Sequence, residues 1–109
     1  MWCPQLFLTA VSNDLVLGYV VASAQDMHGH IISLAVRPKC RRQGIGSDLL
    51  SSLLERLLSI GVEKVMLEVR EDNLAAAALY EKLGFGRSGS ISQYYEDGCG
   101  AILFERLLP

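Results

Sequence analysis

Cysteines are few in this chain of 109 residues, and none occur in pairs. Cys3, Cys40 and Cys99 are odd in number and far apart, so they match neither a disulfide framework nor the ligand spacing of a structural zinc site. We therefore expect reduced thiols, no metal centre and a cytoplasmic setting.

An excess of one charge is also missing. Ten basic and twelve acidic residues give a formal charge of -2, so no whole-protein field draws the chain to nucleic acid or to an anionic membrane. The charge-free stretch from Leu15 to Gln25 is too short to span a bilayer. The start, MWCPQLF, lacks the basic and long apolar regions of a signal peptide. We expect no nucleic-acid or membrane partner, and any anion site must be local.

The residues that are present predict one α/β domain over residues 1–109. Half of them are hydrophobic, and no repeat, linker or low-complexity block divides the chain. Apolar runs bounded by turn residues predict strands at residues 7–11, 15–24, 31–36, 65–70, 85–95 and 101–107. Helices are expected at residues 46–60 and 73–83. The order of elements predicts a mixed sheet with a parallel crossover, which is almost always right-handed.

The first expected helix follows a glycine-rich turn, RRQGIGS, over residues 41–47. Glycines let the backbone approach a ligand closely, the helix start presents unpaired N–H groups, and Arg41 and Arg42 add positive charge. The turn therefore suits a diphosphate, although a plain strand-to-helix turn with solvated arginines has the same composition. A Walker loop is disfavoured because Ser47-Asp48 follows Gly46 in place of a Lys-Ser or Lys-Thr pair. A dinucleotide-binding fold is disfavoured because three strands precede the turn.

Four motifs in this order resemble the GNAT acetyltransferases, in particular the branch that acetylates N-terminal amines. They are HGHIISLAV (28–36), RRQGIG (41–46), LEVREDNLAAAALYEKLGF (67–85) and YYEDG (94–98). The resemblance implies a mixed sheet with helices on both faces. It also implies that this chain lacks the strand and two helices with which members of the family usually begin.

The same resemblance implies that acetyl-CoA is the acetyl donor and assigns residues to it. The pantetheine arm would pair with the end of the strand before the turn, and the diphosphate would lie on the turn itself. Asn73 would bond near the pantetheine or thioester, although the residue could equally be a plain helix cap. The implied cofactor residues are Leu34, Ala35, Val36, Arg41, Arg42, Gln43, Gly44, Ile45, Gly46, Ser47 and Asn73.

Glu68 and His30 are alternative candidates for the general base. Strand alternation places Glu68 near the carboxyl end of its strand, on one face with Met66 and Arg70. From the strand alone, a surface pair of Glu68 with Arg70 is the favoured interpretation, whereas the resemblance implies that Glu68 is the base. His30 has a near-neutral intrinsic pKa and lies on the strand that leads to the turn.

Tyr80 is the candidate general acid. It shares a helical stripe with Ala76, Ala77 and Leu83, so small neighbours would let its hydroxyl approach a ligand. The alternative is a core aromatic. Tyr80 follows Glu68 by twelve residues, the spacing for which the family implies an acid beside the thioester sulfur.

The acceptor expected from the resemblance is the N-terminal α-amine of a protein or peptide. Tyr94 and Tyr95 resemble the family's peptide-binding tyrosine pair, although adjacent strand tyrosines could also be one buried and one exposed. Two other functions stay open: a lysine or small-molecule acetyltransferase, and a non-catalytic acetyl-CoA sensor. Exposed apolar sheet surface would also be compatible with a homodimer.

Overall fold

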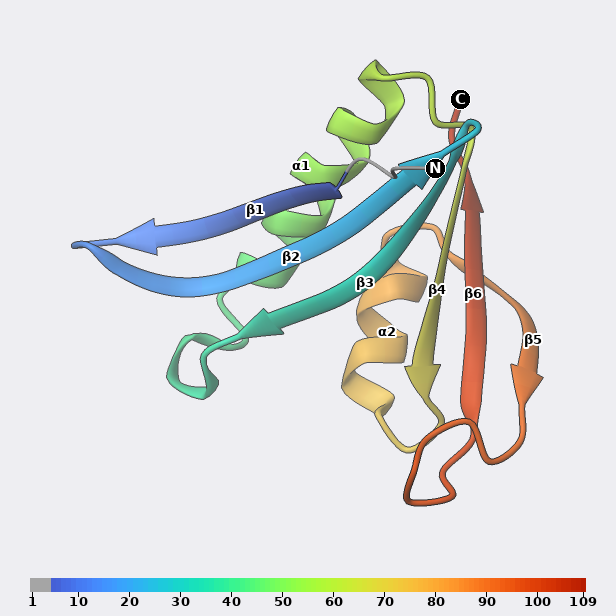
Figure 1. The fold of residues 1–109 in the computed structure, drawn as a ribbon. Coiled ribbons are helices and arrows are strands. Elements are labelled where there is room, and N and C mark those ends of the chain that lie inside the picture. Colours follow the sequence, from blue (N-terminus) through green and yellow to red (C-terminus); the bar gives the residue numbers. More distant parts are fainter. Residues whose placement is uncertain (1–4) are drawn as a thin grey trace.

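The computed structural model describes residues 5–109, which form six strands and two α-helices (Figure 1). The strands are β1 (Gln5–Ser12), β2 (Leu15–Gln25), β3 (His28–Val36), β4 (Lys64–Arg70), β5 (Gly86–Ile91) and β6 (Ala101–Leu107). The helices are α1 (Ile45–Ser59) and α2 (Leu74–Lys82), and a 3-10 turn (Pro38–Cys40) precedes α1. The strands form one sheet in the order β1-β2-β3-β4-β6-β5. The expected mixed α/β sheet is confirmed.

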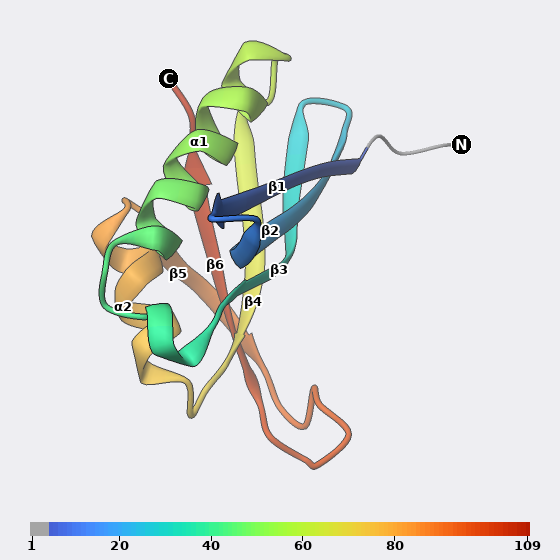
Figure 2. The ribbon, with the colours of Figure 1, turned by 90° about the vertical axis from the view of Figure 1, so that its left-hand side faces the viewer.

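Both helices lie on the same face of the sheet (Figures 1 and 2), whereas helices on both faces were expected. The connections explain this arrangement. β3 and β4 are parallel, and β4 is also parallel to β5 because each runs antiparallel to β6. Two right-handed crossovers that advance in the same direction across a sheet place their helices on one side. Among residues 5–109 the other face carries no helix, and we call it the open face.

The core lies between this sheet and the two helices. Five leucines of α1 are buried, which confirms the amphipathic pattern, and they are Leu49, Leu50, Leu53, Leu54 and Leu57. They pack in one cluster with inward residues of the sheet such as Val20, Val65 and Leu67. Burial of a side chain of this size contributes about 1.5–3 kcal/mol. The buried leucines therefore hold the start of α1 in place against the end of β3.

The sheet opens between β3 and β4. The two strands pair only from His28 to His30 with Lys64 to Met66, and beyond this point they diverge (Figure 1). β3 continues to Val36 while bonded to β2 on its other side. Its last residues therefore present backbone groups to a gap in the sheet.

Two expected strand boundaries were wrong. β3 begins at His28 because Asp26 and Met27, with φ of 52° and 68°, form a two-residue hairpin turn that leaves His28 and Gly29 in the ladder. β5 ends at Ile91, so residues 92–95 belong to a loop. In that loop Gln93 takes a φ of 53°, which interrupts extended backbone.

No helix among residues 5–109 is long and apolar enough to cross a bilayer. Cys40 and Cys99 are free thiols, and Cys3 lies outside the described residues.

Candidate active site

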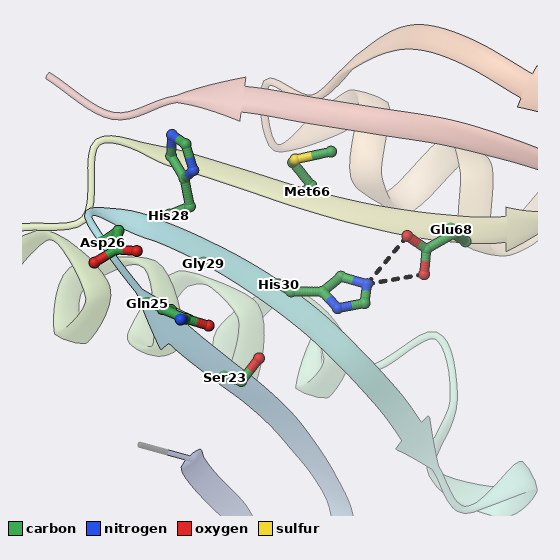
Figure 3. Close-up of a pocket in the computed structure, with 8 residues that line it drawn as sticks. All are labelled: Ser23, Gln25, Asp26, His28, Gly29, His30, Met66 and Glu68. Atoms are coloured by element: carbon green, nitrogen blue, oxygen red, sulfur yellow. Dashed lines mark hydrogen bonds and ion pairs between the residues drawn. The ribbon is translucent and has the colours of Figure 1, made fainter. Parts of the chain in front are cut away.

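The two candidate bases lie side by side on the open face. His30 Nε2 is 2.8 Å from Glu68 Oε1 and 3.0 Å from Oε2 (Figure 3). The parallel register pairs His30 with Met66, and Glu68 follows two residues later on the same face. The side chains are 47% and 23% exposed, so both can meet a ligand from solvent. The strand positions therefore combine two candidates into one hydrogen-bonded pair.

The alternative surface pair between Glu68 and Arg70 does not form. Glu68 bonds to His30, whereas Arg70 turns to Asp72 and Asp97. Among residues 5–109 the hydrogen-bond partner of the Glu68 carboxylate is thus the His30 imidazole.

A shallow depression of about 470 Å³ adjoins this pair on the open face (Figure 3). Besides His30 and Glu68, its lining contains Ser23, Gln25, Asp26, His28, Gly29 and Met66. Most of its polar groups come from the turn end of the β2–β3 hairpin, where β2 ends and β3 begins, so it offers an acceptor hydrogen-bonding groups and a carboxylate.

Tyr80 lies on the other side of the sheet. Its ring packs in the core against Phe85, with centroids 5.6 Å apart, and against Phe104, with centroids 6.3 Å apart. The core interpretation is thus correct for the ring. No described residue bonds to the hydroxyl, and no buried side-chain oxygen among residues 5–109 is left without a partner, so the hydroxyl retains contact with solvent. Burial raises the pKa of Tyr80 to about 12, which keeps its proton in place at neutral pH.

The glycine turn presents a helix start without a cap. Gly44 precedes α1 with a φ of 82°, and no side chain of the described residues caps the helix there. The first amide with a helical acceptor is that of Asp48, which donates to the Gly44 carbonyl at 2.9 Å. The preceding N–H groups and the positive end of the helix dipole are therefore available to an anion.

The two arginines of the turn differ in what they contact. Arg41 Nε donates to the Val36 carbonyl at 3.1 Å and so ties the turn to the end of β3. Arg42 is exposed, takes a φ of 65° and has no ion-pair partner among residues 5–109. Arg42 is therefore the freer positive charge for a diphosphate.

Leu34, Ala35 and Val36 form one border of the gap in the sheet. They pair with β2 at Val20, Tyr19 and Gly18. On the β4 side, pairing has already ended at His30. A ligand with amide groups could extend the sheet along this free edge.

Asn73 is a helix cap. Its side-chain oxygen accepts a hydrogen bond from the Ala76 N–H at 3.1 Å at the start of α2. The helix-cap alternative is thus confirmed, and a contact of Asn73 with a ligand stays a prediction.

Tyr94 and Tyr95 lie in the loop between β5 and β6, and their rings meet edge to face with centroids 5.0 Å apart. Arg70 lies over the Tyr95 ring at 5.0 Å and binds Asp97 Oδ2 through Nη2 at 2.6 Å. These contacts of Arg70 and Asp97 are not predicted from the sequence. The alternation of β4 placed Arg70 on the face of Glu68, but nothing in the sequence showed that residue 97 would meet it.

Comparison with known proteins agrees with this arrangement. The model of the Acetyltransferase (GNAT) family matches residues 1–85. An uncharacterised N-acetyltransferase of Methanocaldococcus jannaschii is 38% identical over 107 residues, which cover 97% of this chain and 69% of that protein. N-alpha-acetyltransferase 30 of Schizosaccharomyces pombe is 34% identical over 93% of this chain and 71% of its own length.

Solved structures give the same result. The ribosomal-protein-S18-alanine N-acetyltransferase of Escherichia coli matches with a TM-score of 0.88 and 33% identity, over 94% of this chain and 68% of that one. The PaiA N-acetyltransferase of Thermoplasma acidophilum, solved in complex with coenzyme A, shares the fold with a TM-score of 0.83 at 19% identity, over 95% of this chain and 61% of that one. The family match, these identities and the shared fold together show that the chain belongs to the GNAT family of acetyltransferases.

Proposed function

We propose that this chain transfers the acetyl group of acetyl-CoA to the N-terminal α-amine of a protein or peptide. The observation that carries the proposal is the His30–Glu68 pair on the open face, beside the strand whose far end leads into the uncapped start of α1. The His30–Glu68 pair can accept a proton, and the start of α1 can hold a diphosphate. The gap between β3 and β4 connects them.

The donor fits the groups on the helix side. The unpaired N–H groups before Asp48 and the charge of Arg42 suit the diphosphate, and the free edge of β3 from Leu34 to Val36 suits the amide groups of pantetheine. Gly44 takes a left-handed φ, and beyond its two chain neighbours no described residue would lie within 4 Å of a side chain placed there, so the backbone is accessible. These features support the cofactor residues implied by the sequence.

The reaction requires the amine nitrogen to attack the thioester carbonyl carbon while the carbon–sulfur bond breaks. The nitrogen loses a proton and the sulfur gains one. Glu68, bonded to His30, accepts the proton on the open face. Tyr80, which like any phenol is protonated at neutral pH, donates to the sulfur from the helix side. In this proposal β4 separates the two groups, so the base and the acid approach the reacting centre from opposite sides of the sheet.

The choice of acceptor rests on the free energy of deprotonation. An α-amine has a pKa near 8 and a lysine amine has a pKa near 10.4, so a neutral lysine costs about 3 kcal/mol more at neutral pH. A site with one carboxylate–imidazole pair therefore suits the amine that is easier to deprotonate. The N-alpha-acetyltransferase and alanine N-acetyltransferase named above support the same choice.

The test uses matched peptides. We expect the purified chain to release thiol from acetyl-CoA with a peptide that has a free N-terminus, and not with the same peptide blocked at its N-terminus and carrying an internal lysine. Turnover with only lysine peptides or small amines would replace the proposal with that alternative. Binding of acetyl-CoA without turnover on any amine would indicate a sensor. A cytoplasmic location and a homodimer stay predictions.

A further inference from the structure

The loop between β5 and β6 is held to the body of the protein by Arg70. At the end of β4 its guanidinium binds Asp97 at 2.6 Å between Nη2 and Oδ2, and at 3.4 Å between Nη1 and Oδ1. On its other edge Nε lies 3.3 Å from Asp72 Oδ1. The planar guanidinium can satisfy both carboxylates at once, which a single ammonium group could not do with the same geometry.

Asp97 carries this attachment into the loop backbone. Its Oδ1 accepts the Cys99 N–H at 3.0 Å, and the Tyr95 N–H donates to the Cys99 carbonyl at 3.0 Å. The Gly98 N–H donates to the Tyr95 carbonyl at 2.9 Å. Residues 95–99 therefore form a closed turn, and among residues 5–109 the side-chain hydrogen bonds that join this turn to β4 are the two between Asp97 and Arg70.

The arginine also supports the tyrosines. Its guanidinium lies 5.0 Å from the centroid of the Tyr95 ring, and the Tyr95 ring meets that of Tyr94 edge to face. Tyr95 is partly buried, whereas Tyr94 is 47% exposed. The inner ring is thus fixed against the arginine, and the outer ring faces solvent.

The fixed ring borders the candidate base. Glu68 and Arg70 point to the same face of β4 because they are two residues apart. The Tyr95 ring lies 5.0 Å from the Arg70 guanidinium, so the phenol lies over this same face, next to the strand position of Glu68. Displacement of the loop would therefore remove an aromatic wall from beside Glu68.

We propose that Arg70 is a positioning residue, which through Asp97 holds Tyr94 and Tyr95 beside Glu68 so that they receive the acceptor peptide. The inference rests on the proposed function, because it assigns the acceptor to this side of the base. In this proposal the Arg70 guanidinium contacts neither the amine nitrogen nor the thioester carbon that react. Its loss should weaken acceptor binding while the donor site, which lies at the start of α1, is unchanged.

The kinetic test compares Arg70→Gln and Asp97→Asn with the wild type. We expect each variant to raise the KM of an N-terminal peptide about fivefold to tenfold, with kcat and the Kd of acetyl-CoA within about twofold. Arg70→Lys should give a smaller rise in KM, since lysine keeps the positive charge but lacks the planar guanidinium that binds two carboxylates. Arg87→Gln is the matched control, because Arg87 also pairs with a carboxylate, that of Glu81 at 3.8 Å, and lies 5.8 Å from the centroid of an aromatic ring, that of Phe104.

A second readout does not depend on activity. Hydrogen exchange should accelerate about fivefold or more at the amides of Tyr95, Gly98 and Cys99 in Arg70→Gln and Asp97→Asn, and should be unchanged in α1 and β6. Asp97 lies on the exposed loop, so Asp97→Asn tests the contact even if Arg70→Gln fails to fold.

The outcomes separate the two proposals. An active wild type whose acceptor KM or loop exchange is the same in Asp97→Asn would overturn the role of Arg70 and leave the proposed function intact. A wild type that binds acetyl-CoA but neither binds nor acetylates the peptide would overturn the proposed function. It would also overturn the assignment of the loop to an acceptor, even with altered exchange.

Discussion

His30 and Glu68, which are 38 residues apart in the sequence, form a hydrogen bond of 2.8 Å across β3 and β4. The sequence predicts the two residues as alternative candidates for the general base. In the structure the imidazole and the carboxylate form one hydrogen-bonded pair, so changes at the two positions should not be independent.

The first prediction concerns the carboxylate. Glu68→Gln keeps the shape and a hydrogen-bonding group but removes the proton acceptor, and we expect kcat/KM to fall about 10²–10⁴-fold. The matched control is Glu105→Gln, since Glu105 lies opposite Met66 on β6 and is paired with Lys64 at 3.1 Å. Equal activity of Glu68→Gln and wild type in the thiol-release assay would exclude Glu68 as the base.

The second prediction concerns the energetic coupling between His30 and Glu68. We expect His30→Gln to lower kcat/KM about tenfold, and the double variant with Glu68→Gln to be within about twofold of Glu68→Gln alone. The reason is that the imidazole acts through the carboxylate to which it bonds. Multiplicative losses in the double variant would show that the two groups work separately.

The third prediction concerns Tyr80. Tyr80→Phe retains the ring contacts with Phe85 and Phe104 but removes the hydroxyl, so the chain should fold and bind acetyl-CoA while kcat falls about 10²-fold or more. Isothermal titration measures the Kd of acetyl-CoA, and steady-state kinetics measure kcat. An unchanged kcat would remove Tyr80 from the mechanism.

The fourth prediction concerns stability at high pH. Burial raises the pKa of Tyr80 from 10.0 to about 12, so the unfolded chain loses this proton at a lower pH than the folded one. The contribution is fully present below pH 10 and is lost as the pH rises toward 12, on the order of 3 kcal/mol. Urea unfolding from pH 9 to 12 should show a steeper loss in wild type than in Tyr80→Phe. Parallel curves would contradict the burial of this phenol.

The fifth prediction concerns the donor site. Arg42→Gln removes the freer positive charge of the glycine turn, and we expect the Kd of acetyl-CoA to rise about tenfold while the thermal midpoint stays the same. Arg56→Gln, in the last turn of the same helix, is the control and should bind as the wild type does. The prediction is wrong if both variants bind acetyl-CoA equally well.

Local patterns in the sequence were sufficient for most of the elements. The leucines of residues 49–58 predicted α1 because residues three and four apart share a face of a helix. The alternation of β4 likewise predicted that Glu68 shares a face with Met66 and Arg70, and the burial of the residues between them agrees with it. The glycine turn was located by residue type alone, since only its glycines and arginines are needed for the interpretation.

Turn chemistry and loop contacts limited the boundaries. The sequence around Asp26 and Met27 did not show which pair of residues would take positive φ, so the start of β3 was placed three residues late. Tyr94 and Tyr95 were expected on a strand because their residue type favours one. In the structure both tyrosines lie in a loop, where Asp97 bonds to Arg70 and to Cys99. The bond to Arg70 joins residues 27 positions apart, so no local sequence pattern predicts it.

The sequence by itself determined the order of the elements, the glycine turn before α1 and the face on which Glu68 lies. The tertiary structure alone decided that His30 would be the partner of Glu68, that Arg70 would hold the loop of Tyr95, and that both helices would share one face. The physical reason is the range of the interactions. Helix and strand periodicity depend on residues two to four apart, whereas these pairings depend on the register and direction of strands that only the crossover connections bring together.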